Sequence, residues 1–184
     1  MNDGIIAARY ARALLKYVRE TGQEDETFAQ ASSLVLLFRK IPRFREAVEG
    51  NKELSIEKKT SFMETALNRE LTDALKRFAF LADTHSRMGY WSRMLSSFVD
   101  MYMDSRNMKP GVLVTAIPQN GLKERLEAAM GKRFGAEVVL DARVDESLTG
   151  GFILEVGDLR MDASVAGQFR RIRKELVEKD NRII

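Results

Sequence analysis

Residues 144–164 read VDESLTGGFILEVGDLRMDAS, and this stretch decides how the C-terminal part of the chain folds. Its glycines, and its acidic residues beside hydroxyls, also raise the question of a phosphate or metal site. A P-loop requires GxxxxGK[ST], and a dinucleotide site requires GxGxxG between a strand and a helix. Neither pattern is present. The glycines instead bracket one predicted strand, Phe152–Val156, and Gly157-Asp158 is typical of a hairpin turn.

Two interpretations of this stretch remain. In the architectural one, Gly150-Gly151 let the backbone enter a closely packed strand and Gly157-Asp158 turn it, while Ser164 or Asp162 caps the last helix. In the other, the stretch is a ligand loop, although it contains no lysine to meet a phosphate. We favour the architectural interpretation.

The flanking sequence predicts a small α/β domain over residues 106–184. Apolar residues alternate over 112–117 and 138–144, which predicts two further strands, and a helical spacing over 122–130 lies between them. After Ser164 the pattern predicts an amphipathic helix with an inward apolar face and an outward basic face. The expected inward residues are Val165, Phe169, Ile172 and Leu176, and the outward ones are Arg170, Arg171, Arg173 and Lys174.

Residues 1–105 have helical spacing almost throughout. Trp91, Leu95 and Phe98 recur at steps of three and four, and similar stripes precede them. We expect six helices packed as a bundle, one of them short after Pro42 and one capped by the Ser55 hydroxyl. The predicted fold class is therefore α+β, an N-terminal six-helix bundle (1–105) followed by a small α/β domain (106–184).

Composition narrows the function classes. Hydrophobic residues make up 45% and charged residues 31%, as in soluble globular proteins, and no apolar run is long enough to span a bilayer. The N-terminus lacks the features of a secretory signal. The absence of cysteine excludes disulfides and thiolate metal sites. A net charge of +3 leaves open a basic RNA-binding module, for which the run 170–174 is the best argument, although acidic residues follow it closely.

Catalytic chemistry has little support in the sequence. His85 is the only histidine, and nothing near it resembles a nucleophile elbow. Carboxylate pairs such as Asp145-Glu146 lie in loop-like contexts without an apolar wall to raise a pKa. We therefore predict no catalytic residue, no metal site and no cofactor.

The same residues carry a resemblance to a known family. The stretch from 144 onward resembles the C-terminal signature of the delta subunit of F-type ATP synthases, the family of the mitochondrial oligomycin sensitivity-conferring protein. The matching positions are Val144, Asp145, Leu148, Gly150, Gly151, Gly157, Asp158, Asp162 and Ser164. ARYARALLKYVRE near the N-terminus is similar to the family's first helix. The chain departs from the pattern at Ala163, where glycine is common, and at THSRM (84–88), where Asn-Gly-Arg or Asn-Lys-Arg is usual.

The resemblance implies a non-catalytic peripheral-stalk subunit, or stator, of a proton-translocating ATP synthase. Such a subunit binds the N-terminal helix of an alpha subunit with its helical domain and the C-terminal ends of the b subunits with its C-terminal domain. It thereby holds the alpha/beta head so that rotor torque drives ATP synthesis. The resemblance further implies a peripheral location on the cytoplasmic face of the bacterial inner membrane, and no nucleic acid or small-molecule substrate.

A partner helix docks through apolar anchors in a groove between two helices. The first and fifth predicted helices have apolar residues beyond what one core-facing stripe requires. We hypothesise that these residues border an alpha-subunit groove; the alternative is that all of them belong to the core. They are Tyr10, Ala13, Leu14, Phe78 and Phe80.

Overall fold

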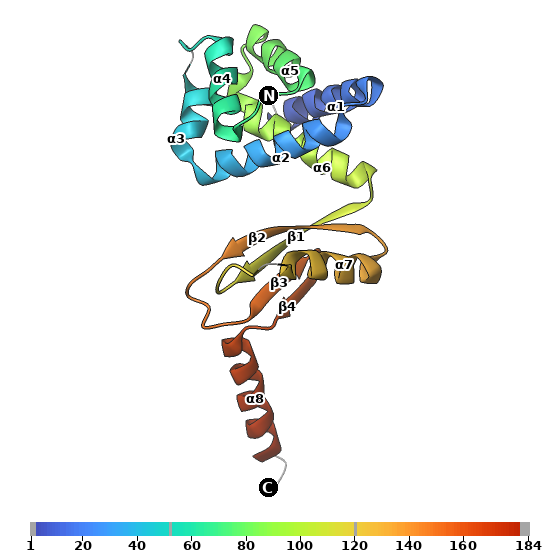
Figure 1. The fold of residues 1–184 in the computed structure, drawn as a ribbon, viewed down its shortest axis with the longest axis vertical. Helices are drawn as coiled ribbons and strands as arrows, with labels where there is room; N and C mark the ends of the chain where they lie inside the picture. Colours follow the sequence, from blue (N-terminus) through green and yellow to red (C-terminus); the bar gives the residue numbers. More distant parts are fainter. Residues whose placement is uncertain (1–2, 52, 120, 181–184) are drawn as a thin grey trace. The chain divides into compact units, whose positions relative to one another are not determined.

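The computed structural model describes residues 3–51, 53–119 and 121–180, with side chains described as far as Lys174. The chain divides into two compact units, Met1–Tyr102 and Met103–Ile184, so the division falls three residues before the boundary expected from the sequence. Each unit is described by itself. Helices dominate the first, and the second contains a four-stranded sheet (Figure 1). The α+β class is confirmed.

The first unit is built from helices that share one apolar core. In order they are α1 (Asp3–Thr21), α2 (Glu24–Lys40), α3 (Pro42–Arg45), the π-helical turn η1 (Glu46–Gly50), α4 (Ile56–Leu67), α5 (Asp73–Thr84), the 3₁₀ turn η2 (Met88–Tyr90) and α6 (Trp91–Ser105). The α6 stripe predicted from the sequence is buried, with Trp91, Leu95 and Phe98 fully inaccessible. Among the described residues α3 is only four residues long and continues into η1, so a bundle of six full helices is not confirmed.

The N-terminus of α4 lacks the side-chain cap that the sequence predicts. Ser55 does occupy the N-cap position of α4, but its side chain makes no capping hydrogen bond. Its hydroxyl bonds the Glu57 carboxylate instead, which lowers the pKa of that exposed group. The predicted Ser55 cap is therefore wrong, because this hydroxyl meets the Glu57 side chain and accepts no N–H of the first turn of α4.

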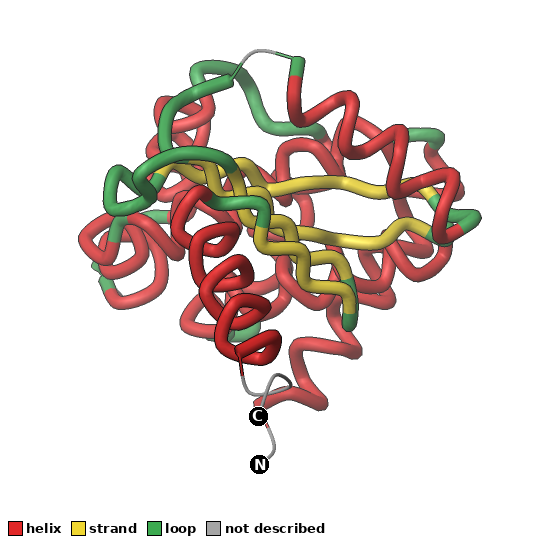
Figure 2. Tube along the Cα trace, turned by 90° about the horizontal axis from the view of Figure 1, so that it is seen from below, coloured by secondary structure: helices red, strands yellow, loops and turns green. Residues whose placement is uncertain are grey.

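The second unit contains one sheet, whose strands are yellow in Figure 2, and its strand order is β2-β1-β3-β4. Its elements are β1 (Met108–Thr115), α7 (Leu122–Phe134), β2 (Glu137–Val144), β3 (Phe152–Val156), β4 (Leu159–Asp162) and α8 (Val165–Asp180). β1 and β2 are parallel and are joined through α7, whereas β3 is antiparallel to both β1 and β4. The first strand begins earlier and ends earlier than predicted, which leaves Ile117 exposed beyond it.

The core of the second unit lies between the sheet and α7. Leu113, Leu140 and Leu154 are almost fully buried there, and Met130 of α7 packs against them. Glu127 of α7 also accepts a hydrogen bond from the backbone N–H of Leu140 at 2.8 Å, which satisfies an amide of the edge strand β2. Helix α7 is therefore held to β2 by both apolar and polar contacts.

Helix α8 does not bury the face that its sequence pattern predicts. Phe169 is 68% exposed and Ile172 is 53% exposed, so the expectation that both point inward is wrong. The side chain of Leu176 lies outside the described residues. An amphipathic pattern requires an apolar surface to cover it, and the sheet core of this unit is already filled by α7. The apolar face of α8 is therefore unpartnered within the described part of the chain.

Candidate functional site

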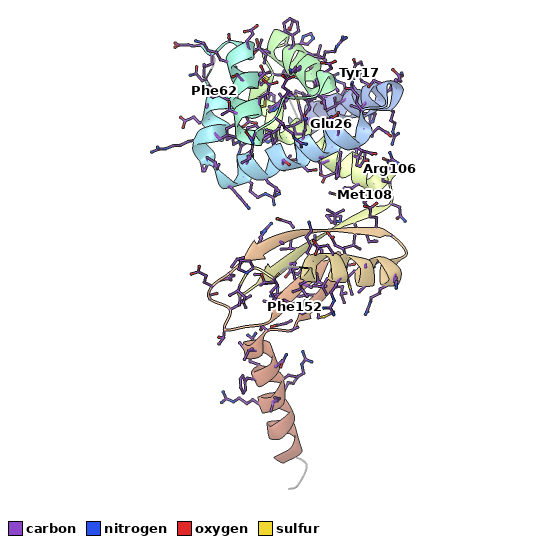
Figure 3. All side chains as sticks on the ribbon, viewed as in Figure 1. Tyr17, Glu26, Phe62, Arg106, Met108 and Phe152 are labelled. Atoms are coloured by element: carbon purple, nitrogen blue, oxygen red, sulfur yellow. The ribbon has the colours of Figure 1, made fainter. Side chains whose placement is uncertain are left out.

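A shallow apolar groove runs between α1 and α5. It has a volume of about 250 Å³ and is lined by Ala13, Leu14, Tyr17, Ala74, Arg77, Phe78 and Leu81. The α1 residues lie within four positions of one another, and those of α5 are spaced by three and four, so each set shares one helix face. Tyr17 is labelled on α1 in Figure 3. Three of the five predicted groove residues, Ala13, Leu14 and Phe78, are thus brought together.

The other two predicted residues lie elsewhere. Tyr10 is buried below the groove, with its ring centroid 6.1 Å from that of Phe78. Phe80 is 62% exposed and does not line the groove, because it follows Phe78 by two positions and so points off that face. The groove residues not predicted as such were Tyr17, Ala74, Arg77 and Leu81. Continuing the α5 stripe in steps of three and four from Ala74 would have found them on that helix.

An aromatic pair connects the groove residue Phe78 to the core of the first unit. The rings of Phe78 and Trp91 have centroids 5.0 Å apart, and Trp91 is fully buried. The guanidinium of Arg87 lies 5.2 Å from the centroid of the Tyr10 ring and donates a 2.8 Å hydrogen bond to the Tyr10 hydroxyl. The altered turn at 84–88 therefore supplies a cation that fixes Tyr10 against Phe78.

Buried polar residues fix the start of α5. Thr72 is its N-cap and accepts a hydrogen bond from the N–H of Leu75 at 3.3 Å. The buried Gln30 of α2 accepts from the N–H of Thr72 at 2.9 Å and donates to the carbonyl of Glu70 at 3.0 Å. The oxygen and the nitrogen of the Gln30 side-chain amide are both hydrogen-bonded. A shift of α5 along α2 would therefore break buried hydrogen bonds.

An ion pair ties α4 to the other end of α5. Lys59 of α4 is 3% exposed, so its side chain is packed within the first unit. Its ammonium lies 3.6 Å from the carboxylate of Asp83. His85, at the C-cap of α5, lies in the turn that follows this pair. The groove is therefore built on a helix that is anchored at both ends.

The signature residues of the second unit have architectural roles. Gly157-Asp158 turn a hairpin between β3 and β4, with Gly157 at φ +56°. Gly151 has φ +78°, and a Cβ there would lie 2.2 Å from the carbonyl oxygen of Ala163. Only glycine fits that position. The Gly150 carbonyl accepts from the N–H of Val165 at 3.0 Å, which ties the start of α8 to the loop before β3.

Asp162 and Ser164 together cap α8. The Ser164 hydroxyl accepts from the N–H of Gly167 at 3.0 Å and donates to the Asp162 carboxylate at 2.5 Å. The hydroxyl and then the backbone N–H of Ser164 hold the pKa of Asp162 below its ordinary value. Arg170 reaches the same carboxylate at 3.1 Å. This carboxylate is occupied by the chain's own donors, as the architectural interpretation predicts.

The remaining signature residues shape the loop between β2 and β3. Val144 ends β2, where it pairs with Thr115. The Asp145 carboxylate accepts from the N–H of Ser147 at 2.9 Å, and hydrogen bonds from the Ser147 side chain and backbone lower the pKa of Asp145. The N–H of Leu148 donates to the carbonyl of Asp145 at 3.1 Å. The loop is thus folded by its own hydrogen bonds.

Two further features bear on function. In the described part of the chain, no three His, Cys, Asp or Glu side chains gather as a metal site. None of its helices is long and apolar enough to cross a membrane. The groove between α1 and α5 is the candidate site because its apolar lining suits a helix or another apolar surface better than a polar substrate.

Comparisons with known proteins agree with the resemblance seen in the sequence. The family model for the ATP synthase delta (OSCP) subunit matches residues 6–176. ATP synthase subunit delta from Phocaeicola vulgatus is 34% identical over 186 residues, and that from Bacteroides thetaiotaomicron is 32% identical over 187; both alignments cover 100% of each chain. A chain in the Toxoplasma gondii mitochondrial ATP synthase hexamer is 20% identical, with a TM-score of 0.59 and coverage of 93% of this chain and 97% of that one. This last likeness shows a shared fold alone.

The resemblance is confirmed over nearly the whole chain, and the RNA-binding alternative gains no support from it. With a matching family model and full-length relatives above 30% identity, the chain belongs to the ATP synthase delta (OSCP) subunit family, whose members are structural and not catalytic subunits.

Proposed function

We propose that this chain is the peripheral-stalk subunit that links the alpha/beta catalytic head of an F-type ATP synthase to its b subunits. The first unit binds the N-terminal helix of an alpha subunit, and the second unit contacts the b subunits. The chain prevents the alpha/beta head from turning with the rotor. The torque of the rotor then deforms the catalytic sites of the head. It acts at the cytoplasmic face of the bacterial inner membrane, attached through the complex.

The observation that carries the alpha-subunit contact is the groove between α1 and α5. It is walled by apolar side chains from two helices, which is the geometry that accepts an amphipathic helix through anchors at i, i+3 or i+4, and i+7. Ala13 is exposed at its rim and leaves space for a partner side chain. A stator must not release its head, so we expect nanomolar affinity in the complex, about 12 kcal/mol.

Titration calorimetry with a synthetic alpha N-terminal helix tests this contact. We expect saturable binding to the chain and its loss in Ala13→Phe, whose ring fills the groove. Ala29→Phe on α2 is the matched control, since Ala29 is also exposed on a helix and lies outside the groove. No binding by the unaltered chain, or equal binding by both variants, would reject the groove as the alpha-subunit site.

Phe80 provides a second, milder test. Its exposed ring stands one face away from the groove, where the flank of a docked helix could reach it. Phe80→Ala should therefore weaken the peptide less than Ala13→Phe does, and it should leave the stability of the chain unchanged within about 0.5 kcal/mol. The size of its effect measures how far the contact extends beyond the groove.

For the b subunits we propose the exposed apolar face of α8. Phe169 and Ile172 are three residues apart on one helix face, and both are exposed. Replacing both with serine should abolish binding of a C-terminal b peptide while leaving the alpha-peptide titration unchanged. If the double variant kept full affinity for the b peptide, the contact would have to lie elsewhere in the second unit.

A further inference from the structure

The groove between α1 and α5 carries one charged side chain in an otherwise uncharged wall. Arg77 lines it, three residues after Ala74 and four before Leu81, on the same face of α5. No described carboxylate lies within ion-pair distance of its guanidinium. The neighbouring Lys76 instead pairs with Glu64 at 3.0 Å and Glu70 at 3.7 Å. Arg77 is thus an exposed, unpaired cation on the wall of an apolar groove.

The α1 side of the groove adds a second cation. Arg9 is exposed and precedes Ala13 by four residues, so it lies on the neighbouring turn of the same flank. Further along α1, Lys16 and Glu20 neutralise each other at 3.8 Å. The nearest acid on α5 is Asp73, in its first turn, and it forms no ion pair with Arg77. The rim of the groove therefore has an excess of positive charge.

We infer that Arg77 selects the partner by charge, so that the groove takes an amphipathic helix with a carboxylate beside its apolar stripe. This inference rests on the proposed function and deepens it. The apolar anchors fill the groove, and the carboxylate lies against the planar guanidinium, which can hold it with two parallel hydrogen bonds. A partner helix without this carboxylate binds less well, because Arg77 would lose its hydration without gaining an ion-pair partner.

A charge series at Arg77 tests the inference on the full-length chain with the alpha N-terminal peptide. Arg77→Gln should weaken binding about two- to fivefold, as for a partly exposed ion pair, and Arg77→Glu about tenfold. Arg77→Lys should fall between the unaltered chain and Arg77→Gln, since it keeps the charge and loses the fork. Arg39→Glu, at an exposed site on α2 outside the groove, is the matched control and should change affinity less than twofold.

Charge exchange separates recognition from a general loss of fit. A peptide in which the carboxylate beside the apolar stripe is replaced by lysine should bind Arg77→Glu more tightly than it binds the unaltered chain. Affinity of the unaltered pair should also fall a few fold between low and 0.5 M salt, far less than for nucleic acid.

The outcomes distinguish the inference from the function beneath it. If the unaltered chain binds the alpha peptide, and Arg77→Glu binds it as tightly as Arg39→Glu does, the inference is overturned while the groove remains the alpha site. A lysine peptide that prefers the unaltered chain overturns it as well. If the unaltered chain binds no alpha peptide at all, the proposed contact and the inference fail together.

Discussion

Replacing Ser164 with alanine should loosen the start of α8 without disturbing the sheet. The Ser164 hydroxyl is the acceptor for the N–H of Gly167, and Ser164 is 1% exposed, so water cannot easily take its place. Loss of an N-cap hydroxyl costs about 1 kcal/mol, and the burial here favours the upper part of the 0.5–2 kcal/mol range. Ser164→Gly should cost only a few tenths of a kcal/mol, because removal of the Cβ as well opens the Gly167 N–H to water.

Amide hydrogen exchange is the appropriate assay for this change. Trp91 is the only tryptophan, and all four tyrosines precede residue 103, so intrinsic fluorescence reports on the first unit. A loss of 1–2 kcal/mol should speed exchange of the Gly167 amide about 5- to 30-fold. Amides of α7 should be unaffected. Unchanged exchange at Gly167 in Ser164→Ala, or a glycine variant as fast as the alanine one, would refute the capping role.

Three further predictions concern stability. Gly151→Ala should destabilise the second unit by more than about 2 kcal/mol, measured by calorimetric unfolding, because its Cβ meets a backbone carbonyl at 2.2 Å and φ is +78°; a wild-type melting temperature would contradict this. Gln30→Leu leaves the Thr72 N–H without its acceptor and should cost about 1–3 kcal/mol in urea unfolding followed by Trp91 fluorescence; an unchanged midpoint would be inconsistent with that bond. Because folding lowers the pKa of Asp162, its carboxylate contributes to the free energy of unfolding above the ordinary aspartate pKa of about 4, and this contribution is lost as pH falls through the lower pKa of the folded state. An Asp162→Asn variant that unfolds in acid with the same profile as the unaltered chain would argue against it.

Sequence reasoning succeeded at most places where structure depends on local chemistry, the missing Ser55 cap being the exception. The hairpin at Gly157-Asp158 and the cap at Ser164 follow from what those residue types do within three positions, and both are present. Sequence reasoning failed where the burial of a helix face depends on which other surface packs against it. The pattern of α8 identified an apolar face at Phe169 and Ile172, but nothing in the sequence states whether that face is covered inside the chain or by a partner.

The groove shows the same division. Apolar excess on the first and fifth helices was enough to place Ala13, Leu14 and Phe78 in one site. Phe80 was included because it is an apolar residue outside the main stripe of the fifth helix, but helical geometry turns it away from the groove. Arg77 was overlooked because a charged residue on a helix is usually a solvated one, and only its position on the groove wall distinguishes it.

The most direct test of the account uses membranes of the source organism that contain the other subunits of its ATP synthase but lack this chain. The account predicts that the alpha/beta head detaches or hydrolyses ATP without pumping protons, and that adding the purified chain restores both attachment and proton pumping. Addition of the Ala13→Phe variant should restore neither. Membranes that keep a fully coupled head without the chain would contradict the central claim that it is the mechanical link.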